Sequence, residues 1–245
     1  MECEKVQYSH YFQLFSPPIT RSRDLLSSFL GCFYNCGFEL EEGDWGDRTL
    51  DVQFNAFQSS TELSLSFRMI EDKNDDAGIS IFPNGDQYYT NGCSLGYIII
   101  TVNQMDNAWM DESELRWKKI KRFQRILSVL KLLTPLVHAY YGYSNSYETY
   151  PEYFVKYINI GKARFPFDQT FWGTDYPTRP NTEIQEQLKA LGYQVENTQA
   201  GTWLYRPVEE RNSPDVRLDG EKVKEILGYD DDEGFTTIWA KPNDK

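Results

Sequence analysis

The side chains best suited to acid–base chemistry lie in the second half of this 245-residue chain. His138 is one of only two histidines, and Asp168 and Asp175 lie within an aromatic-rich stretch. A histidine can serve as a general base, and carboxylates can take part in the same kind of proton transfer. One hypothesis is therefore an enzyme of unknown reaction that uses a cleft lined by carboxylates and aromatic rings. No catalytic residue is assigned on this basis.

Motifs that would identify a particular reaction are absent or incomplete. Neither G-x-x-x-x-G-K-S/T nor G-x-G-x-x-G occurs, so no phosphate-binding loop is predicted. Residues 142–146 (GYSNS) begin like the nucleophile elbow of a serine hydrolase, but the closing glycine is missing. Residues 72–78 alternate oxygen-bearing side chains as a calcium loop does, yet Pro83 stands where that loop needs a glutamate. The sequence therefore predicts neither a hydrolase triad nor a calcium site.

The cysteines do not have the spacing of a metal site. The chain contains Cys3, Cys32, Cys36 and Cys93, of which only Cys32 and Cys36 could share a helical face. A zinc ion would need two further ligands near them. Because no export signal is evident, free thiols are favoured over disulfides. We therefore predict no metal ligand and no cofactor.

Two features remain once catalytic motifs are set aside, an aromatic-rich stretch and an acidic charge balance. Tyrosines crowd residues 140–157, and more aromatic residues follow in 165–176. Tyrosine and tryptophan dominate interface hot spots because they bury a large area at low entropic cost. The alternative, that these rings fill the core, is left open. The candidate binding residues are Tyr143, Tyr147, Tyr150, Trp172, Tyr176, Asp230, Asp231 and Asp232.

The charge balance restricts the class of partner. The formal net charge is −12, from 37 acidic and 25 basic residues, and acids concentrate in residues 31–76 and 207–245. Such a surface repels phosphates, so we predict no nucleic-acid binding and favour a basic protein partner. Acidity that merely keeps the chain soluble is the alternative. No signal peptide and no membrane-length apolar run occur, which predicts a cytoplasmic protein without a membrane contact.

Residues 111–134 should form the helix around which the fold is built. Apolar residues recur along one side at spacings of three, four and seven, and basic residues gather on the other. Pro135 should end or kink this helix because it has no backbone N–H. The apolar series is Ile120, Phe123, Leu127, Leu130 and Val137, and the basic series is Lys118, Lys121, Arg122 and Arg125.

Alternating apolar residues predict several strands before and after that helix. They include 49–57, 62–69 and 97–102, the last apolar throughout and so expected in the middle of a sheet. Asn84-Gly85 is typical of a tight hairpin turn. Residues 163–178 should form an ordered aromatic loop. Further predictions are a strand at 6–15, a helix at 21–34 capped by Thr20, a strand at 38–40, a helix at 182–191 capped by Asn181 or Thr182, a hairpin formed by 193–198 and 202–206, a helix at 219–227 and a strand at 235–240.

These elements predict an α+β fold, with a mainly antiparallel sheet, a long amphipathic helix packed across it and shorter helices on one face. The stretch that joins the two halves is too aromatic for a flexible linker. We therefore expect a single α+β domain over residues 1–245. A division into 1–141 and 142–245 is left open.

The second half of the chain resembles the immunity proteins of bacterial polymorphic-toxin systems. The similarity rests on residues 140–207, namely YYGYSNSYETYPEYF, FPFDQTFWGTDYP, LGYQV and GTWLYRP, and it is compositional. It implies a small acidic α+β protein that binds and neutralises a cognate toxin. The leading hypothesis is therefore a non-enzymatic inhibitor that binds a basic protein. The enzyme described above and a module that binds a small ligand or peptide are the alternatives.

Overall fold

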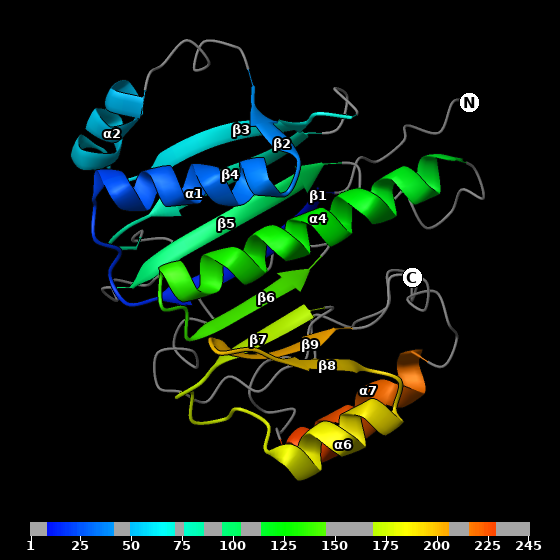
Figure 1. Ribbon diagram of the computed structural model, residues 1–245. Helices are drawn as coiled ribbons and strands as arrows, with labels where there is room; N and C mark the ends of the chain where they lie inside the picture. The colour runs from blue at the N-terminus through cyan, green and yellow to red at the C-terminus, as the bar shows by residue number, and fades with distance from the viewer. Residues whose placement is uncertain are drawn as a thin grey trace, which may run out of the picture.

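The computed structural model of the chain describes residues 9–41, 50–71, 76–85, 95–103, 114–145, 169–205 and 216–228. It is a mixed helix and strand structure built on one nine-stranded sheet with the order β2-β3-β4-β5-β1-β6-β7-β9-β8 (Figure 1). All eight strand pairs are antiparallel. The strands are β1 (Ser9–Ser16), β2 (Phe38–Leu40), β3 (Leu63–Met69), β4 (Asp76–Phe82), β5 (Gly96–Asn103), β6 (Tyr141–Asn145), β7 (Gln169–Gly173), β8 (Gln194–Asn197) and β9 (Gly201–Tyr205).

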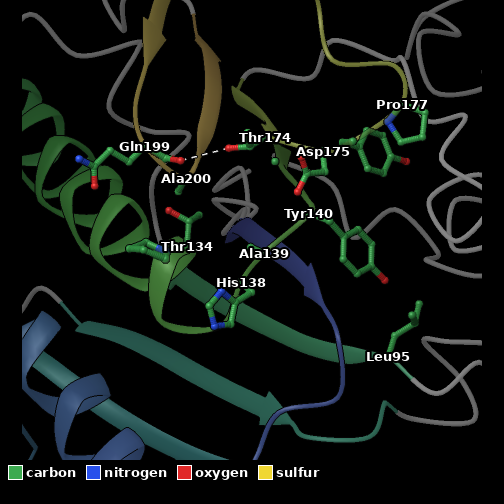
Figure 2. Close-up of a pocket in the computed structure, with 13 residues that line it drawn as sticks. Leu95, Thr134, His138, Ala139, Tyr140, Thr174, Asp175, Pro177, Gln199 and Ala200 are labelled. Atoms are coloured by element: carbon green, nitrogen blue, oxygen red, sulfur yellow. Dashed lines mark hydrogen bonds between the residues drawn. The ribbon is translucent and has the colours of Figure 1, made fainter.

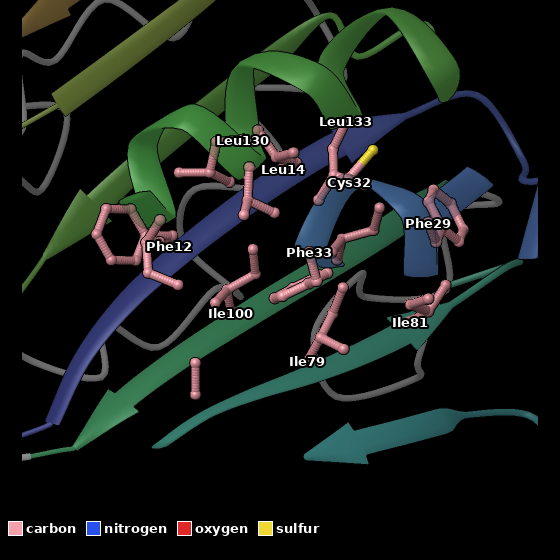
Figure 3. Packing of buried hydrophobic residues seen from close by; sticks show 14 of the residues in the cluster. Phe12, Leu14, Phe29, Cys32, Phe33, Ile79, Ile81, Ile100, Leu130 and Leu133 are labelled. Atoms are coloured by element: carbon pink, nitrogen blue, oxygen red, sulfur yellow. The ribbon is translucent and has the colours of Figure 1, made fainter. Parts of the chain in front are cut away.

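Helices contribute to the buried clusters on both faces of this sheet. They are α1 (Arg23–Asn35), α2 (Leu50–Ser59), α4 (Glu114–Leu136), α6 (Thr182–Ala190) and α7 (Val216–Leu227). The first cluster joins apolar side chains of α1, α2 and α4 to strands β1, β3, β4 and β5, and Figure 3 shows its centre. The second joins Leu188 of α6 and Val223 of α7 to aromatic residues of β1, β5, β6 and β7. The expectation of helices on one face is therefore wrong, because the second face is itself too apolar to stay exposed.

Helix α4 supplies much of the first cluster. Phe123, Ile126, Leu130 and Leu133 are buried, and the ring of Phe123 lies 5.3 Å from that of Phe12 in β1. Pro135 lies inside the helix as its penultimate residue, so α4 ends at Leu136, two residues beyond the predicted end. The amphipathic pattern before Lys121 stays a prediction, because those side chains lie outside the described residues.

The basic side of α4 contacts the rest of the protein rather than solvent alone. Arg125 pairs through Nη2 with Oε1 of Glu71 at 2.9 Å, and its Nη1 lies 3.4 Å from the carbonyl oxygen of Gly37. Lys121 pairs with the same carboxylate. Hydrogen bonds from Lys121 and Arg125 hold the pKa of Glu71 below its ordinary value. Arg125, on the basic side of the predicted helix, therefore links α4 to the ends of α1 and β3.

Two predicted elements have the wrong type. Residues 49–57 were expected as a strand, but Leu50–Ser59 is helix α2. Leu50, Phe54 and Phe57 are also spaced for one side of a helix, and packing on the core decided between the two patterns. The stretch 163–178 was expected as a loop, but it contains strand β7, whose five residues are all buried. Ladder hydrogen bonds to β6 and β9 satisfy its backbone groups, so this part of the stretch is a strand and not a loop.

Two local predictions are corrected as well. The N-cap of α1 is Ser22 rather than Thr20, and its side chain accepts a hydrogen bond from the Leu25 N–H. Gly85 does close a turn through a bond to the Phe82 carbonyl. It is no two-residue hairpin, however, because Phe82 at the end of β4 pairs with Tyr97 of β5.

Most remaining strand and helix predictions are confirmed within the described residues. Strand β5 pairs on both sides, with β4 and β1, as expected for its apolar sequence. Asn181 caps α6, and β8 and β9 form the predicted hairpin. Helix α7 begins at Val216, three residues before the predicted start. Strand β1 pairs with β6, so the sheet is continuous across residue 141. The predicted strand at 235–240 lies outside the described residues.

The two glycines of the α1 region should respond in opposite ways to a methyl group. Gly31 lies inside α1, and no atom lies within 4 Å of the place that a Cβ would occupy, so Gly31→Ala should stabilise by about 0.5–1 kcal/mol. Gly37 follows the helix at φ +82°, so Gly37→Ala should cost about 1–2 kcal/mol. Urea denaturation of both variants measures these changes. Equal effects on the unfolding midpoint would contradict the assigned end of α1.

Candidate functional site

The end of α4 has an unusual backbone that shapes one wall of a pocket. The N–H of His138 bonds to the Pro135 carbonyl at 3.4 Å, and the N–H of Ala139 bonds to the Thr134 carbonyl at 2.9 Å. This pair of bonds is the Schellman motif, whose C′ residue adopts the left-handed conformation. His138 has φ 51° and is the only non-glycine residue with positive φ among the described ones. Glycine is the usual occupant, so the motif turns an exposed imidazole outward where most helices have no side chain.

The turn after β7 forms the opposite wall. The N–H of Gly173 bonds to the Tyr140 carbonyl at 2.9 Å, and that of Thr174 bonds to the Ala200 carbonyl at 3.0 Å. A Cβ on Gly173 would lie 2.8 Å from the Ala139 oxygen, so the turn can approach this segment only because residue 173 has no side chain. The Thr174 hydroxyl also donates to the Gln199 carbonyl at 3.1 Å. These bonds hold three segments of the chain in fixed positions.

Between these walls lies a pocket of about 720 Å³, which Figure 2 shows. Its volume is within the range of sites that bind small molecules or side chains in proteins. The lining combines apolar and aromatic surface with one carboxylate and one imidazole. The lining residues are Leu95, Thr134, Pro135, His138, Ala139, Tyr140, Gly173, Thr174, Asp175, Tyr176, Pro177, Gln199 and Ala200.

Among the described residues that line the pocket, Asp175 supplies the one carboxylate and His138 the one imidazole. Figure 2 shows the Asp175 carboxylate on the turn after β7 and the His138 imidazole at the end of α4, so the two come from different walls. Both side chains are exposed, and neither makes a hydrogen bond or ion pair with another described residue. The structure therefore brings together two members of the acid–base hypothesis. Asp168, the third, lies outside the described residues.

Stacked tyrosines close the pocket on its inner side. The rings of Tyr140 and Tyr176 are nearly parallel, at 4° with their centroids 6.2 Å apart. Tyr141 contacts Tyr176 at 5.3 Å between centroids and meets Trp172 edge to face. Tyr140 is half-buried and Tyr176 is buried, so the wall of the pocket continues into the second cluster.

The predicted binding aromatics that the structure describes are core residues. Tyr143, Trp172 and Tyr176 expose 3%, 0% and 6% of their surface. The Tyr143 hydroxyl donates to Oε1 of Gln13 at 2.9 Å, and the Tyr97 hydroxyl donates to the same oxygen at 2.6 Å. Of the two interpretations of these rings, their placement favours the core. Tyr147, Tyr150, Asp230, Asp231 and Asp232 lie outside the described residues, and their binding role stays a prediction.

The cysteines offer no reactive centre in the described part of the chain. Cys32 and Cys36 are both free, and Cys32 is buried. Burial raises the pKa of the Cys32 thiol to about 11, and the neighbouring Cys36 adds to the shift. Burial also raises the pKa of Cys36, although Arg125 opposes this. Both thiols therefore stay protonated and unreactive at neutral pH. Within the described ranges, no group of three or more potential ligands could hold a metal ion.

Sequence reasoning named Asp175 and His138 but missed the residues that build the pocket around them. Thr174, Gln199 and Ala200 contribute mainly backbone atoms and short side chains. The glycine of the Trp172-Gly173-Thr174 sequence was the one available signal, since glycine permits a close approach of two backbones. None of the described helices has the length and apolar character needed to cross a membrane.

Comparison with known proteins gives information on the fold. No family model matches the chain, and no curated protein matches it in sequence. Among solved structures, the chain is similar to the Pseudomonas aeruginosa T6SS protein PA0821, with a TM-score of 0.50 and 11% sequence identity. The match covers 91% of this chain and 73% of that chain. At this level of identity the similarity shows a related fold.

Proposed function

We propose that this chain is a non-enzymatic, cytoplasmic protein that binds a basic protein partner, and that the partner is a bacterial toxin which it neutralises. The observation that carries the proposal is that, within the described ranges, five exposed acids but only one exposed base, Lys222, make no ion pair. Complementary charge of this kind accelerates encounter with a basic protein and discriminates against acidic ones.

Within the described ranges, ion pairs engage most of the exposed bases, whereas several exposed acids make no ion pair. Six bases are paired with acids, namely Arg23, Arg68, Lys121, Arg125, Lys131 and Lys189. Exposed acids that make no ion pair within the described ranges are Asp24, Glu41, Asp175, Glu183 and Glu225. The formal charge of −12 for the whole chain adds to this surplus, since the sequence has 37 acidic and 25 basic residues.

Two further points support the toxin as the class of partner. The composition of residues 140–207 resembles immunity proteins, and the similar Pseudomonas structure is that of a T6SS protein. A T6SS protein is compatible with a toxin-related role for this chain.

The proposal is tested with the product of whichever gene lies directly upstream of the gene for this chain. Coexpression should restore growth of cells that produce that protein, and the two should purify as a complex. Their association rate should fall steeply with ionic strength. Absence of both growth protection and a complex would refute the proposed function.

Matched charge variants separate a binding surface from acidity that only confers solubility. Glu183→Gln with Glu225→Gln should slow association by about two- to tenfold, whereas Lys222→Gln, which removes an exposed base, should accelerate it. Stopped-flow measurements at low and at physiological salt give these rates. Melting temperatures should stay nearly constant, because exposed charges contribute little to stability. If the association rate does not depend on the sign of the charge change, electrostatic steering plays no part in binding.

A second function is favoured by one observation, the presence of Asp175 and His138 in a single pocket. In that case the chain would bind or convert a small molecule there. Saturable binding of a small molecule at His138, observed by NMR in a chain that gives no growth protection, would favour this second function over the first.

A further inference from the structure

We propose that the pocket at the end of α4 receives a guanidinium group of the basic partner, with the Asp175 carboxylate as its charged acceptor. The inference rests on the proposed function, because it assigns a place on this chain to a side chain of that partner. The inference is drawn from the Asp175 carboxylate, which lies at the mouth of a pocket with aromatic walls and has no partner among the described residues.

The carboxylate of Asp175 is available to a ligand. The nearest base in sequence, Arg179, is engaged elsewhere: its Nε donates to Thr202 Oγ1 at 2.8 Å and its Nη1 to the Thr174 carbonyl at 3.3 Å. Arg179 makes no ion pair with Asp175. The residue is exposed before binding, and a partner that covers the pocket would remove water from it and strengthen the pair.

The walls of the pocket suit the flat, weakly hydrated guanidinium better than a compact ammonium. Tyr140 and Tyr176 present stacked rings to one side, and a guanidinium can lie on an aromatic face. Pro135 and Pro177 add apolar surface for the methylene stem. A carboxylate can accept two parallel N–H bonds from a guanidinium, which fixes the orientation of the group.

The backbone around the pocket also favours positive charge. Helix α4 ends at Leu136 beside the pocket, and the C-terminal end of a helix carries a partial negative charge. The pocket of about 720 Å³ is lined by residues of three walls and has room for a side chain together with part of the loop that carries it. Of the described residues that line the pocket, His138 is the one other with an acidic or basic side chain, and it stands on the opposite wall from Asp175.

The test compares two variants that change the net charge equally. Asp175→Asn removes the charge from the pocket, and Asp24→Asn removes one from the exposed first turn of α1. In the complex with the upstream-encoded protein, Asp175→Asn should raise the dissociation rate about tenfold or more, whereas Asp24→Asn should change it less than about twofold. Asp175→Lys, which places a cation inside the pocket, should abolish the complex. Unchanged melting temperatures show that each variant is folded.

A peptide probe tests the pocket without the partner. Acetyl-Gly-Arg-Gly amide should shift the NMR signals of His138, Thr174 and Ala200 saturably, and Asp175→Asn should weaken the binding at least about fivefold. The same peptide with citrulline, which is neutral and nearly isosteric, should cause no such shifts. Equal shifts with both peptides would overturn the proposal, since charge would then play no role.

The outcomes separate this inference from the proposed function. If the complex forms and Asp175→Asn dissociates no faster than Asp24→Asn, the pocket inference is wrong and the proposed function stands. If no complex forms, the proposed function fails, and the pocket inference fails with it as a statement about a protein partner. Peptide binding alone would then assign the pocket to small guanidinium compounds.

Discussion

Replacement of Trp172 by alanine is expected to lower the free energy of unfolding by about 3–5 kcal/mol. The side chain is fully buried in β7 and meets the Tyr141 ring edge to face at 77° with 6.2 Å between centroids. Its removal leaves a large cavity in the second cluster, between the sheet and the helices α6 and α7. Urea denaturation followed by circular dichroism measures the loss.

Tyr34 serves as the matched control for this substitution. Its ring is 47% exposed on α1, so Tyr34→Ala should change stability by no more than about 0.5–1 kcal/mol. A similarly small loss in Trp172→Ala would mean that the ring does not belong to the core. The interpretation of Trp172 as a binding anchor would then have to be taken up again, with partner affinity as its measurement.

Helix α4 offers two adjacent leucines that should differ strongly. Leu133 is fully buried in the first cluster, so Leu133→Ala should cost about 2–5 kcal/mol. Leu132 is 43% exposed on the same helix, and Leu132→Ala should stay within about 1 kcal/mol because alanine is also the better helix former. Chemical denaturation of the two variants measures the loss of stability caused by the same leucine-to-alanine substitution at two adjacent positions.

The difference between the two leucines tests the rotational setting of the helix. Similar small losses would mean that α4 is peripheral and that the first cluster is held by α1 and the strands alone. A larger loss in Leu132→Ala would mean that the helix presents a different side to the sheet.

The same experiment on Arg125→Ala should show a loss of about 1 kcal/mol in the free energy of unfolding, because the partly buried guanidinium of Arg125 donates to the Gly37 carbonyl.

Strands could be predicted where the alternation of apolar and polar residues fits a strand but not a helix. In β3, Leu63, Leu65 and Phe67 are buried and the serines between them are exposed, which is the expected period of two. In α2, Leu50 and Phe54 satisfy a period of two and a period of four equally. Val52, which a strand would bury with them, is 45% exposed. The sequence carries no local signal that decides such a case, because the decision comes from packing against α1.

The pocket could be predicted in its parts but not as a site. Asp175 and His138 were recognised by their chemistry. Their common location depends on the pairing of β6 with β7 and of β7 with β9, which joins residues distant in sequence. The left-handed conformation of His138 was equally hidden, since the end of a helix usually uses glycine for it. Long-range pairing and an uncommon backbone state are set by the whole fold.

The position of β1 has a consequence for the order in which the chain can be completed during synthesis. This strand lies between β5, which ends at Asn103, and β6, which ends at Asn145. A five-stranded sheet can therefore form from the first 103 residues, and β1 is its edge until the next 42 residues have emerged. At synthesis rates of about 5–20 residues per second, that interval is roughly 2–8 s. During it, α4 can cover the face of β1 through Phe123, but the unpaired backbone groups along the strand stay open to other nascent chains.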